Sequence, residues 1–143
     1  MEVSIRKATP ADEPWINEQY AIVEFLPSKV SEEYIAIAEM NGTPVGLGRL
    51  VPIPGGANEL GGMYVLPDFR GKGVAGKIVA HLIEKHNHTY DLWCIPFAHL
   101  LPFYGSFGFK EVDIQKVEAP EKVIAKYRYC DGNYNSGVGF MKM

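Results

Sequence analysis

The stretch MYVLPDFRGKGVAGKIV, residues 63–79, combines an apolar run, a glycine-rich basic segment and a second apolar pattern. The apolar run ends at Pro67, and basic residues alternate with glycines from Arg70 to Gly73. Apolar residues then recur in two adjacent rows at i, i+4 spacing: Val74, Ile78, Leu82 and Ala75, Val79, Ile83. This spacing is typical of an amphipathic helix. The pattern therefore predicts a strand that ends near Leu66 and a helix that begins near Gly73.

The chemistry of this junction points to an anion. Backbone N–H groups at a helix N-terminus lack intrahelical acceptors and carry the positive end of the helix dipole. Glycine lets a bulky anion approach the backbone, and Arg70 and Lys72 add positive charge, so the residues favour a pyrophosphate. The stretch lacks the GxxxxGK[ST] spacing of a common nucleotide motif. A tight strand–helix turn with solvated charges remains the alternative.

Composition limits the other function classes. The chain has 143 residues, of which 47% are hydrophobic and 22% charged, and its formal net charge is −3. These values fit one globular domain over residues 1–143 and give no electrostatic case for nucleic acid. No apolar stretch has the length of a membrane span. Cys94 and Cys130 lack CxxC spacing and fit buried thiols in a reducing compartment, so we expect a cytoplasmic protein with no membrane partner.

The order of elements indicates a mixed α+β fold. Residue patterns predict strands over 3–8, 34–40, 45–51, 59–66, 90–95, 109–117 and 137–143. They predict helices from Thr9-Pro10 to before Pro27, from Gly73, over 96–107, and from Pro120 to about Cys130. Asn41-Gly42 signals a hairpin, and we expect Thr43-Pro44 to lengthen its loop. Such an order predicts a mixed sheet with helices packed on it.

Two motifs carry a resemblance to a known family. RGKGVA matches the Q/R-x-x-G-x-G/A signature of the GNAT superfamily of N-acyltransferases, with Arg70, Gly73 and Ala75 on the defined positions. The preceding MYVLPDF resembles the fourth strand of that family, and FYGSFGF (residues 103–109) resembles its second landmark. The resemblance runs from about Val3 to Phe109, and the closing strand also fits.

The resemblance implies a fold and a cosubstrate. A GNAT-like fold has a central mixed, mostly antiparallel sheet of about six to seven strands, helices on both faces, and fourth and fifth strands that splay apart. Acetyl-CoA would enter between those strands as cosubstrate, and no metal is implied. Val65 would pair with the pantetheine arm, the Met63 N–H would face the thioester carbonyl, and the backbone from Gly71 to Gly76 would hold the phosphates. The cofactor-binding residues implied are Met63, Tyr64, Val65, Arg70, Gly71, Lys72, Gly73, Val74, Ala75 and Gly76.

The resemblance also suggests two catalytic residues. Tyr104 lies where the family tyrosine protonates the departing thiolate, and aromatic packing is the alternative. Glu59 lies eleven positions before Arg70, which matches the base of the histone-acetylating branch. A solvated glutamate at the start of a strand, with a water chain as the base, remains an equal alternative. For Cys94 we expect a structural thiol. Arg49 would meet an acidic acceptor or, as we expect, pair with a carboxylate.

The predicted function is transfer of an acetyl group from acetyl-CoA to a primary amine of a small molecule or a protein. A non-catalytic acyl-CoA-binding module and a domain whose glycine turn is only a turn are the alternatives. The family often has an asparagine seven positions before the tyrosine, whereas this chain has Phe97. Residues 112–137 are longer than a plain hairpin connection and would line the acceptor pocket or form a homodimer contact.

Overall fold

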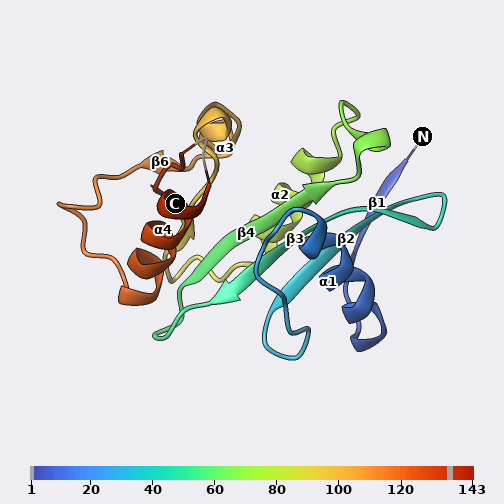
Figure 1. Ribbon diagram of the computed structural model, residues 1–143, viewed down its shortest axis with the longest axis horizontal. Coiled ribbons are helices and arrows are strands. Elements are labelled where there is room, and N and C mark those ends of the chain that lie inside the picture. The colour runs from blue at the N-terminus through green and yellow to red at the C-terminus, as the bar shows by residue number, and fades with distance from the viewer. Residues whose placement is uncertain (1, 135–136) are drawn as a thin grey trace. The chain divides into compact units, whose positions relative to one another are not determined.

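The computed structural model describes residues 2–134 and 137–143, and within these ranges seven strands form one sheet (Figure 1). The strands are β1 (Val3–Lys7), β2 (Tyr34–Met40), β3 (Thr43–Pro52), β4 (Asn58–Val65), β5 (Leu92–Cys94), β6 (Lys110–Glu111) and β7 (Met141–Lys142). Their order is β1-β2-β3-β4-β5-β7-β6. The pairs β1–β2, β2–β3, β5–β7 and β6–β7 are antiparallel, whereas β4–β5 is parallel. The helices are α1 (Glu13–Ile22), α2 (Val74–Lys85), α3 (Leu101–Gly105) and α4 (Glu121–Asn133). The predicted α+β class with a mixed, mostly antiparallel sheet is confirmed.

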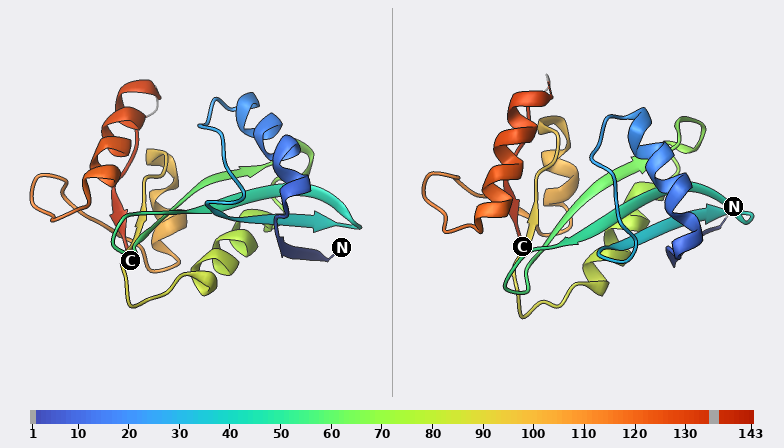
Figure 2. Two further views of the ribbon diagram at one scale, coloured as in Figure 1. Left: turned by 90° about the horizontal axis from the view of Figure 1, so that it is seen from below. Right: turned by 60° about the horizontal axis from the view of Figure 1, so that its bottom comes forward.

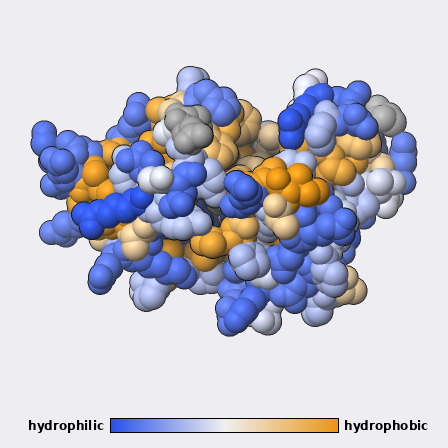
Figure 3. Space-filling view, in the orientation of Figure 1, coloured by the Kyte–Doolittle hydropathy of each residue, from blue (hydrophilic) through white to orange (hydrophobic). Residues whose placement is uncertain are grey.

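The chain divides into two compact units, and β4 contributes to both. Unit 1 contains residues 2–51 and Gly62–His86, and unit 2 contains Pro52–Gly61 and Asn87–Met143 apart from residues 135–136. Each unit has a buried core of its own. None of the helices in the described residues combines the length and the apolar character that crossing a membrane requires. On the face shown in Figure 3, hydrophilic side chains predominate, with apolar areas among them.

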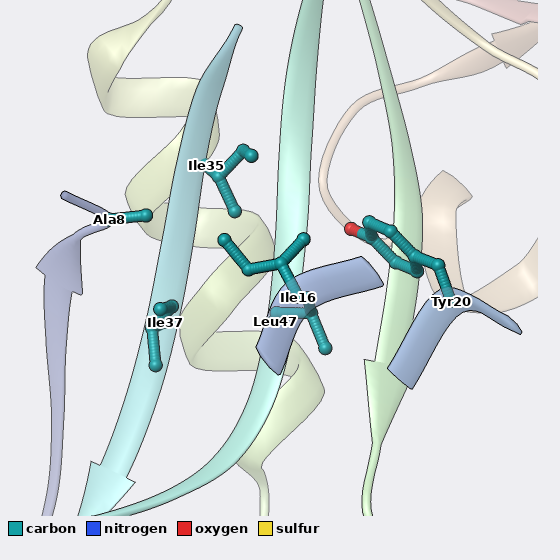
Figure 4. Packing of buried hydrophobic residues seen from close by; sticks show 6 residues of the cluster. All are labelled: Ala8, Ile16, Tyr20, Ile35, Ile37 and Leu47. Carbon is teal, nitrogen blue, oxygen red and sulfur yellow. The ribbon is translucent and has the colours of Figure 1, made fainter. Parts of the chain in front are cut away.

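In unit 1, α1 and α2 cover opposite faces of the sheet (Figure 2). On the α1 face, apolar residues from α1, β2, β3 and the position after β1 form one cluster (Figure 4): Ala8, Ile16, Tyr20, Ile35, Ile37 and Leu47. On the other face, α2 buries Val74, Ile78, Val79 and Leu82. Successive residues of a strand point to opposite faces, and on β3 the residue after Leu47 is Gly48. A Cβ at Gly48 would lie 2.9 Å from Ile78 and 3.1 Å from Leu82, so glycine there lets α2 pack closely.

The β2–β3 hairpin is tighter than we predicted. Met40 pairs with Thr43, so the loop is Asn41-Gly42 alone, with φ of +53° and +75°. Positive φ at both central residues is what a two-residue type I′ turn requires. The predicted lengthening by Thr43-Pro44 is wrong, because both residues belong to β3. A register shift at Ala38/Glu39 absorbs the difference, as a bulge does.

In unit 2, α4 begins directly after Pro120, as predicted, and packs its apolar face on the sheet. The core joins Ile53, Trp93, Val123 and Phe140. The predicted strand over 109–117 is wrong beyond Glu111. The carbonyl of Asp113 accepts the N–H groups of Lys116 and Val117, both at 2.9 Å, and its side chain accepts that of Gln115 at 2.9 Å. Aspartate commonly forms such local turns in place of a strand ladder.

Candidate active site

The turn between β4 and α2 is open to solvent. A 3₁₀ turn, η2 (Pro67–Phe69), follows β4, and Arg70 to Gly73 lead into α2. Gly71 and Gly73 have φ of +76° and +80°, a left-handed backbone that favours glycine. A Cβ placed on either glycine would meet nothing within 4 Å, and both residues are exposed. A ligand can therefore approach the backbone at both positions.

The N-terminus of α2 has the chemistry of an anion site. Gly73 is the N-cap residue, and no side chain of the described residues caps this helix end. The N–H groups of the first turn therefore lack intrahelical acceptors and carry positive dipole charge. Lys72 is exposed beside them. The Nε of Arg70 donates to the carbonyl of Val65 at 2.9 Å, and the guanidinium lies 5.6 Å from the ring centroid of Tyr64.

β4 continues beyond its parallel partner. The β4–β5 ladder pairs Asn58 with Leu92, Glu59 with Trp93 and Leu60 with Cys94, where β5 ends. β4 runs on to Val65 through the half-buried residues Met63 and Tyr64. This early end of the ladder is the predicted splay of the fourth and fifth strands.

Glu59 is buried and ion-paired, not solvated. The residue is 3% exposed, and its Oε1 accepts a hydrogen bond from the Nζ of Lys126 at 2.7 Å. Lys126 lies on α4, so the helix that follows Pro120 supplies the countercharge for a carboxylate on β4. The solvated alternative for Glu59 is therefore wrong, and its role as a base stays a prediction.

Tyr104 lies on α3 and is 4% exposed. Its ring packs edge-to-face against Phe103 and Phe109, with centroid distances of 5.0 and 6.1 Å. Burial raises the pKa of the Tyr104 hydroxyl well above its usual value, and the negative charge that Cys94 and Glu59 can carry raises it further. The hydroxyl therefore remains protonated at neutral pH, which is the state that a general acid needs.

Cys94 and Arg49 are both buried, and their contacts favour structural roles. Cys94 is buried, and burial, followed by the charge of Glu59, raises the pKa of its thiol. A protonated thiol favours the structural role that we expected. Arg49 is 4% exposed, and its Nη1 lies 3.8 Å from the Oε1 of Glu33. Its predicted pairing with a carboxylate is therefore confirmed. Within the described residues, no group of three or more His, Cys, Asp or Glu side chains is arranged to hold a metal ion.

The sequence did not reveal two partners of these residues. Lys126 contacts Glu59 across 67 positions, and the hydroxyl of Tyr20 contacts Gly62 across 42 positions. Lys126 gave no signal apart from its place in the predicted helix after Pro120. Tyr20 showed only helical periodicity, which indicates burial and not a polar contact.

Residues 31–111, more than half of the chain, match the family described as "Acetyltransferase (GNAT) domain". The chain belongs to the GNAT superfamily of acetyltransferases. No curated protein matches the sequence significantly.

Solved structures share the GNAT fold. N-acetylglutamate synthase from Neisseria gonorrhoeae, complexed with coenzyme A and N-acetyl-glutamate, has a TM-score of 0.74 and 20% identity, over 99% of this chain and 35% of its own. Rv2747 from Mycobacterium tuberculosis, in complex with CoA and NLQ, has a TM-score of 0.75 and 21% identity, over 98% of both chains. Naa50 from Arabidopsis thaliana, in complex with the bisubstrate analogue CoA-Ac-MVNAL, has a TM-score of 0.68 and 16% identity, over 100% of this chain and 99% of its own. The GNAT chain thus spans 35% of the synthase and nearly all of the other two proteins.

Proposed function

We propose that this GNAT domain, over residues 1–143, transfers an acetyl group from acetyl-CoA to a primary amine. The observation that carries the proposal is the open N-terminus of α2. There, two left-handed glycines leave the backbone accessible beside Arg70 and Lys72. Such a turn is suited to a pyrophosphate, because several N–H groups can point at the same anion.

The cosubstrate would contact unit 1 in two places. Backbone N–H groups from Gly71 to Gly76, together with Arg70 and Lys72, would bind the phosphates. The residues of β4 beyond the ladder, Met63, Tyr64 and Val65, would bind the pantetheine arm by strand addition. The hydrogen bond from Arg70 to the Val65 carbonyl supports this role, since it ties the end of β4 to the phosphate turn.

The chemistry requires a neutral amine, a polarised carbonyl and a protonated leaving group. The amine nitrogen attacks the thioester carbonyl carbon, and the Met63 N–H would bind the developing oxyanion. The C–S bond then breaks, and Tyr104 would give its proton to the departing sulfur. Glu59, directly or through water, would take the proton that the amine loses. Proton exchange with solvent then restores both side chains.

One observation supports a second candidate function. The Oε1 of Glu59 already accepts a hydrogen bond from Lys126, so the ion pair occupies this oxygen. This contact favours either a water chain as the base or a domain that binds acyl-CoA without catalysis. The acid role of Tyr104 does not depend on the choice between Glu59 and water.

The acceptor class is an amine of a small molecule or a protein. Structural neighbours are bound to N-acetyl-glutamate in one case and to a peptide-based bisubstrate analogue in another, and we include both amino acids and peptides among the acceptors to be tested. We place the reaction in the cytoplasm, which the two free, buried cysteines support.

Calorimetric titration with acetyl-CoA tests the proposal. We expect micromolar binding to the wild type and at least tenfold weaker binding to Gly73→Trp, because an indole would occupy the space of the phosphates. Gly42→Trp is the matched control, since Gly42 has a similar φ of +75° and nothing within 4 Å of its Cβ position, but lies in the β2–β3 turn. Equal binding to both variants, or no binding to the wild type, would overturn the proposal.

A further inference from the structure

The polar group that reaches β4 from α1 is the hydroxyl of Tyr20. The side chain of Tyr20 extends from α1 toward the sheet (Figure 4) and is fully buried, at 0% exposure. Its Oη donates to the carbonyl oxygen of Gly62 at 2.8 Å. Gly62 belongs to the part of β4 beyond the β4–β5 ladder. A buried hydroxyl bonded to a strand carbonyl fixes the orientation of that peptide group, because leaving the pair unmade is costly.

The backbone at Gly62 departs from strand geometry. Its φ is +60°, and a Cβ there would lie 2.5 Å from the Tyr20 Oη and 2.7 Å from the Arg49 Nε. Glycine adopts this conformation without strain, and the close approach leaves no room for a Cβ. The glycine at position 62 therefore allows β4 to turn locally and lets Tyr20 and Arg49 pack against its backbone.

Arg49 holds the phenol ring in place. Its guanidinium lies 4.5 Å from the ring centroid of Tyr20. Its Nη1 donates to the carbonyl of Leu26 at 3.0 Å and to the Ser28 hydroxyl. Its Nε is buried and has no hydrogen-bond partner among the described residues. Its Nη1 also lies 3.8 Å from the Oε1 of Glu33, so the guanidinium packs on the ring while Glu33 supplies the countercharge.

The carbonyl of Gly62 and the N–H of Met63 belong to one peptide group. That bond is trans, so the C=O and N–H bonds point in opposite directions and their dipoles add. A hydrogen bond that fixes the carbonyl also fixes the N–H, and it makes that N–H a stronger donor by polarising the peptide. The Met63 N–H is the group that we assigned to the thioester carbonyl.

We propose that Tyr20 is a positioning residue, which orients and polarises the Gly62–Met63 peptide so that the Met63 N–H binds the thioester carbonyl of acetyl-CoA. This inference rests on the proposed function. Burial raises the pKa of Tyr20; the positive charge of Arg49 opposes that rise, and the negative charge of Glu33 adds to it. The hydroxyl therefore stays protonated, as a donor must.

The test compares Tyr20→Phe with Tyr34→Phe. Tyr34 is a matched control in the same unit, because its hydroxyl lies 2.9 Å from the Nε2 of His81, on α2, and forms no hydrogen bond with the described residues of β4. Isotope-edited infrared difference spectra with acetyl-CoA labelled with ¹³C at its carbonyl measure the polarisation of the bound thioester. Calorimetry with acetyl-CoA and CoA measures how much the acetyl group contributes to affinity.

We expect the bound carbonyl band of Tyr20→Phe to shift to higher wavenumber, with no shift in Tyr34→Phe. The preference for acetyl-CoA over CoA should fall by about twofold to tenfold in Tyr20→Phe alone, the effect of one weakened hydrogen bond. Unchanged band and preference in a folded Tyr20→Phe would overturn the inference. Absence of acetyl-CoA binding to the wild type would instead overturn the proposed function.

A second variant covers the case in which Tyr20→Phe does not fold. Incorporation of 3-fluorotyrosine at position 20 keeps the hydroxyl and makes it a stronger donor. The carbonyl band should then move to lower wavenumber, opposite to the change in Tyr20→Phe. A band that stays at the wild-type position would contradict the role of Tyr20.

Discussion

The hydroxyl of Tyr104 remains protonated far into the alkaline range. Its pKa is raised chiefly by burial and further by Cys94 and Glu59, and a group with a raised pKa keeps its proton at every pH below that value. The surrounding rings of Phe103 and Phe109 exclude water from one side of the phenol. A thiolate that forms near this hydroxyl would therefore find a donor in the correct state.

Replacing Tyr104 with Phe removes the proton and keeps the ring. We expect turnover with the best amine of a panel to fall by about a hundredfold or more, with acetyl-CoA affinity nearly unchanged. The ratio of wild-type to variant turnover should stay constant from about pH 7 to 9, because the raised pKa keeps Tyr104 protonated. Tyr129→Phe is the control, since Tyr129 is 43% exposed and lies in the same unit. A fully active Tyr104→Phe would reduce Tyr104 to a packing residue.

At this scale, the sequence predicts residues whose role follows from a local motif. Arg70, Gly73 and Tyr104 belong to short patterns whose spacing indicates a turn or a short helix. The contacts of Glu59 with Lys126 and of Tyr20 with Gly62 join distant segments. They depend on how the helices pack on the sheet, which one sequence does not specify by periodicity.

Among the elements, α4 contacts the candidate base Glu59 through Lys126. Pro120 is its N-cap residue, and Val123 and Cys130 are buried on one face. Lys126 then reaches the 4% exposed side chain of Glu59, while its own side chain is 25% exposed. Removing one partner of a buried ion pair leaves an uncompensated charge.

A double-mutant cycle measures this link. We expect Lys126→Met to lower the free energy of unfolding by about 1–3 kcal/mol, because Glu59 loses its partner. Adding Glu59→Gln should recover part of that loss, so the two effects will not be additive. Urea unfolding of the four proteins checks this result. Lys122→Met is the control, since Lys122 lies on the same helix and donates to the exposed Pro52 carbonyl at 3.1 Å, not to a buried carboxylate of the described residues. Additive effects would show that α4 and Glu59 are independent.

The sequence predicts best those elements in which apolar residues recur at a regular spacing over several turns. The rows on α2 place its start correctly at Val74, after Gly73. The predicted lengths of the β2–β3 loop and of the strand that begins at Phe109 are wrong. In both cases, backbone hydrogen bonding determines where the strand begins or ends. Pro44 is tolerated in β3 beside a register shift, and the side chain of Asp113 closes a turn that ends β6 early. Alternation of apolar residues carries no information on either event.

Across the whole molecule, the net charge opposes the proposed cosubstrate. The chain carries a formal charge of −3, and coenzyme A is a polyanion. Long-range electrostatics would therefore repel acetyl-CoA. Binding must come from the local positive charge at the start of α2, where Lys72 and Arg70 are exposed beside the N–H groups of the helix.

These two contributions predict opposite salt dependences. If the local contacts dominate, as we propose, raising the ionic strength from about 0.02 to 0.5 M should weaken acetyl-CoA binding by about threefold to tenfold, because exposed charge pairs are screened. Lys72→Gln should bind more weakly at low salt and show a smaller salt dependence, whereas Lys77→Gln, on the exposed side of α2, should behave as the wild type. Calorimetry at several salt concentrations gives these slopes. Binding that strengthens with salt would mean that the overall repulsion dominates, and the cluster at the start of α2 would then not be the phosphate site.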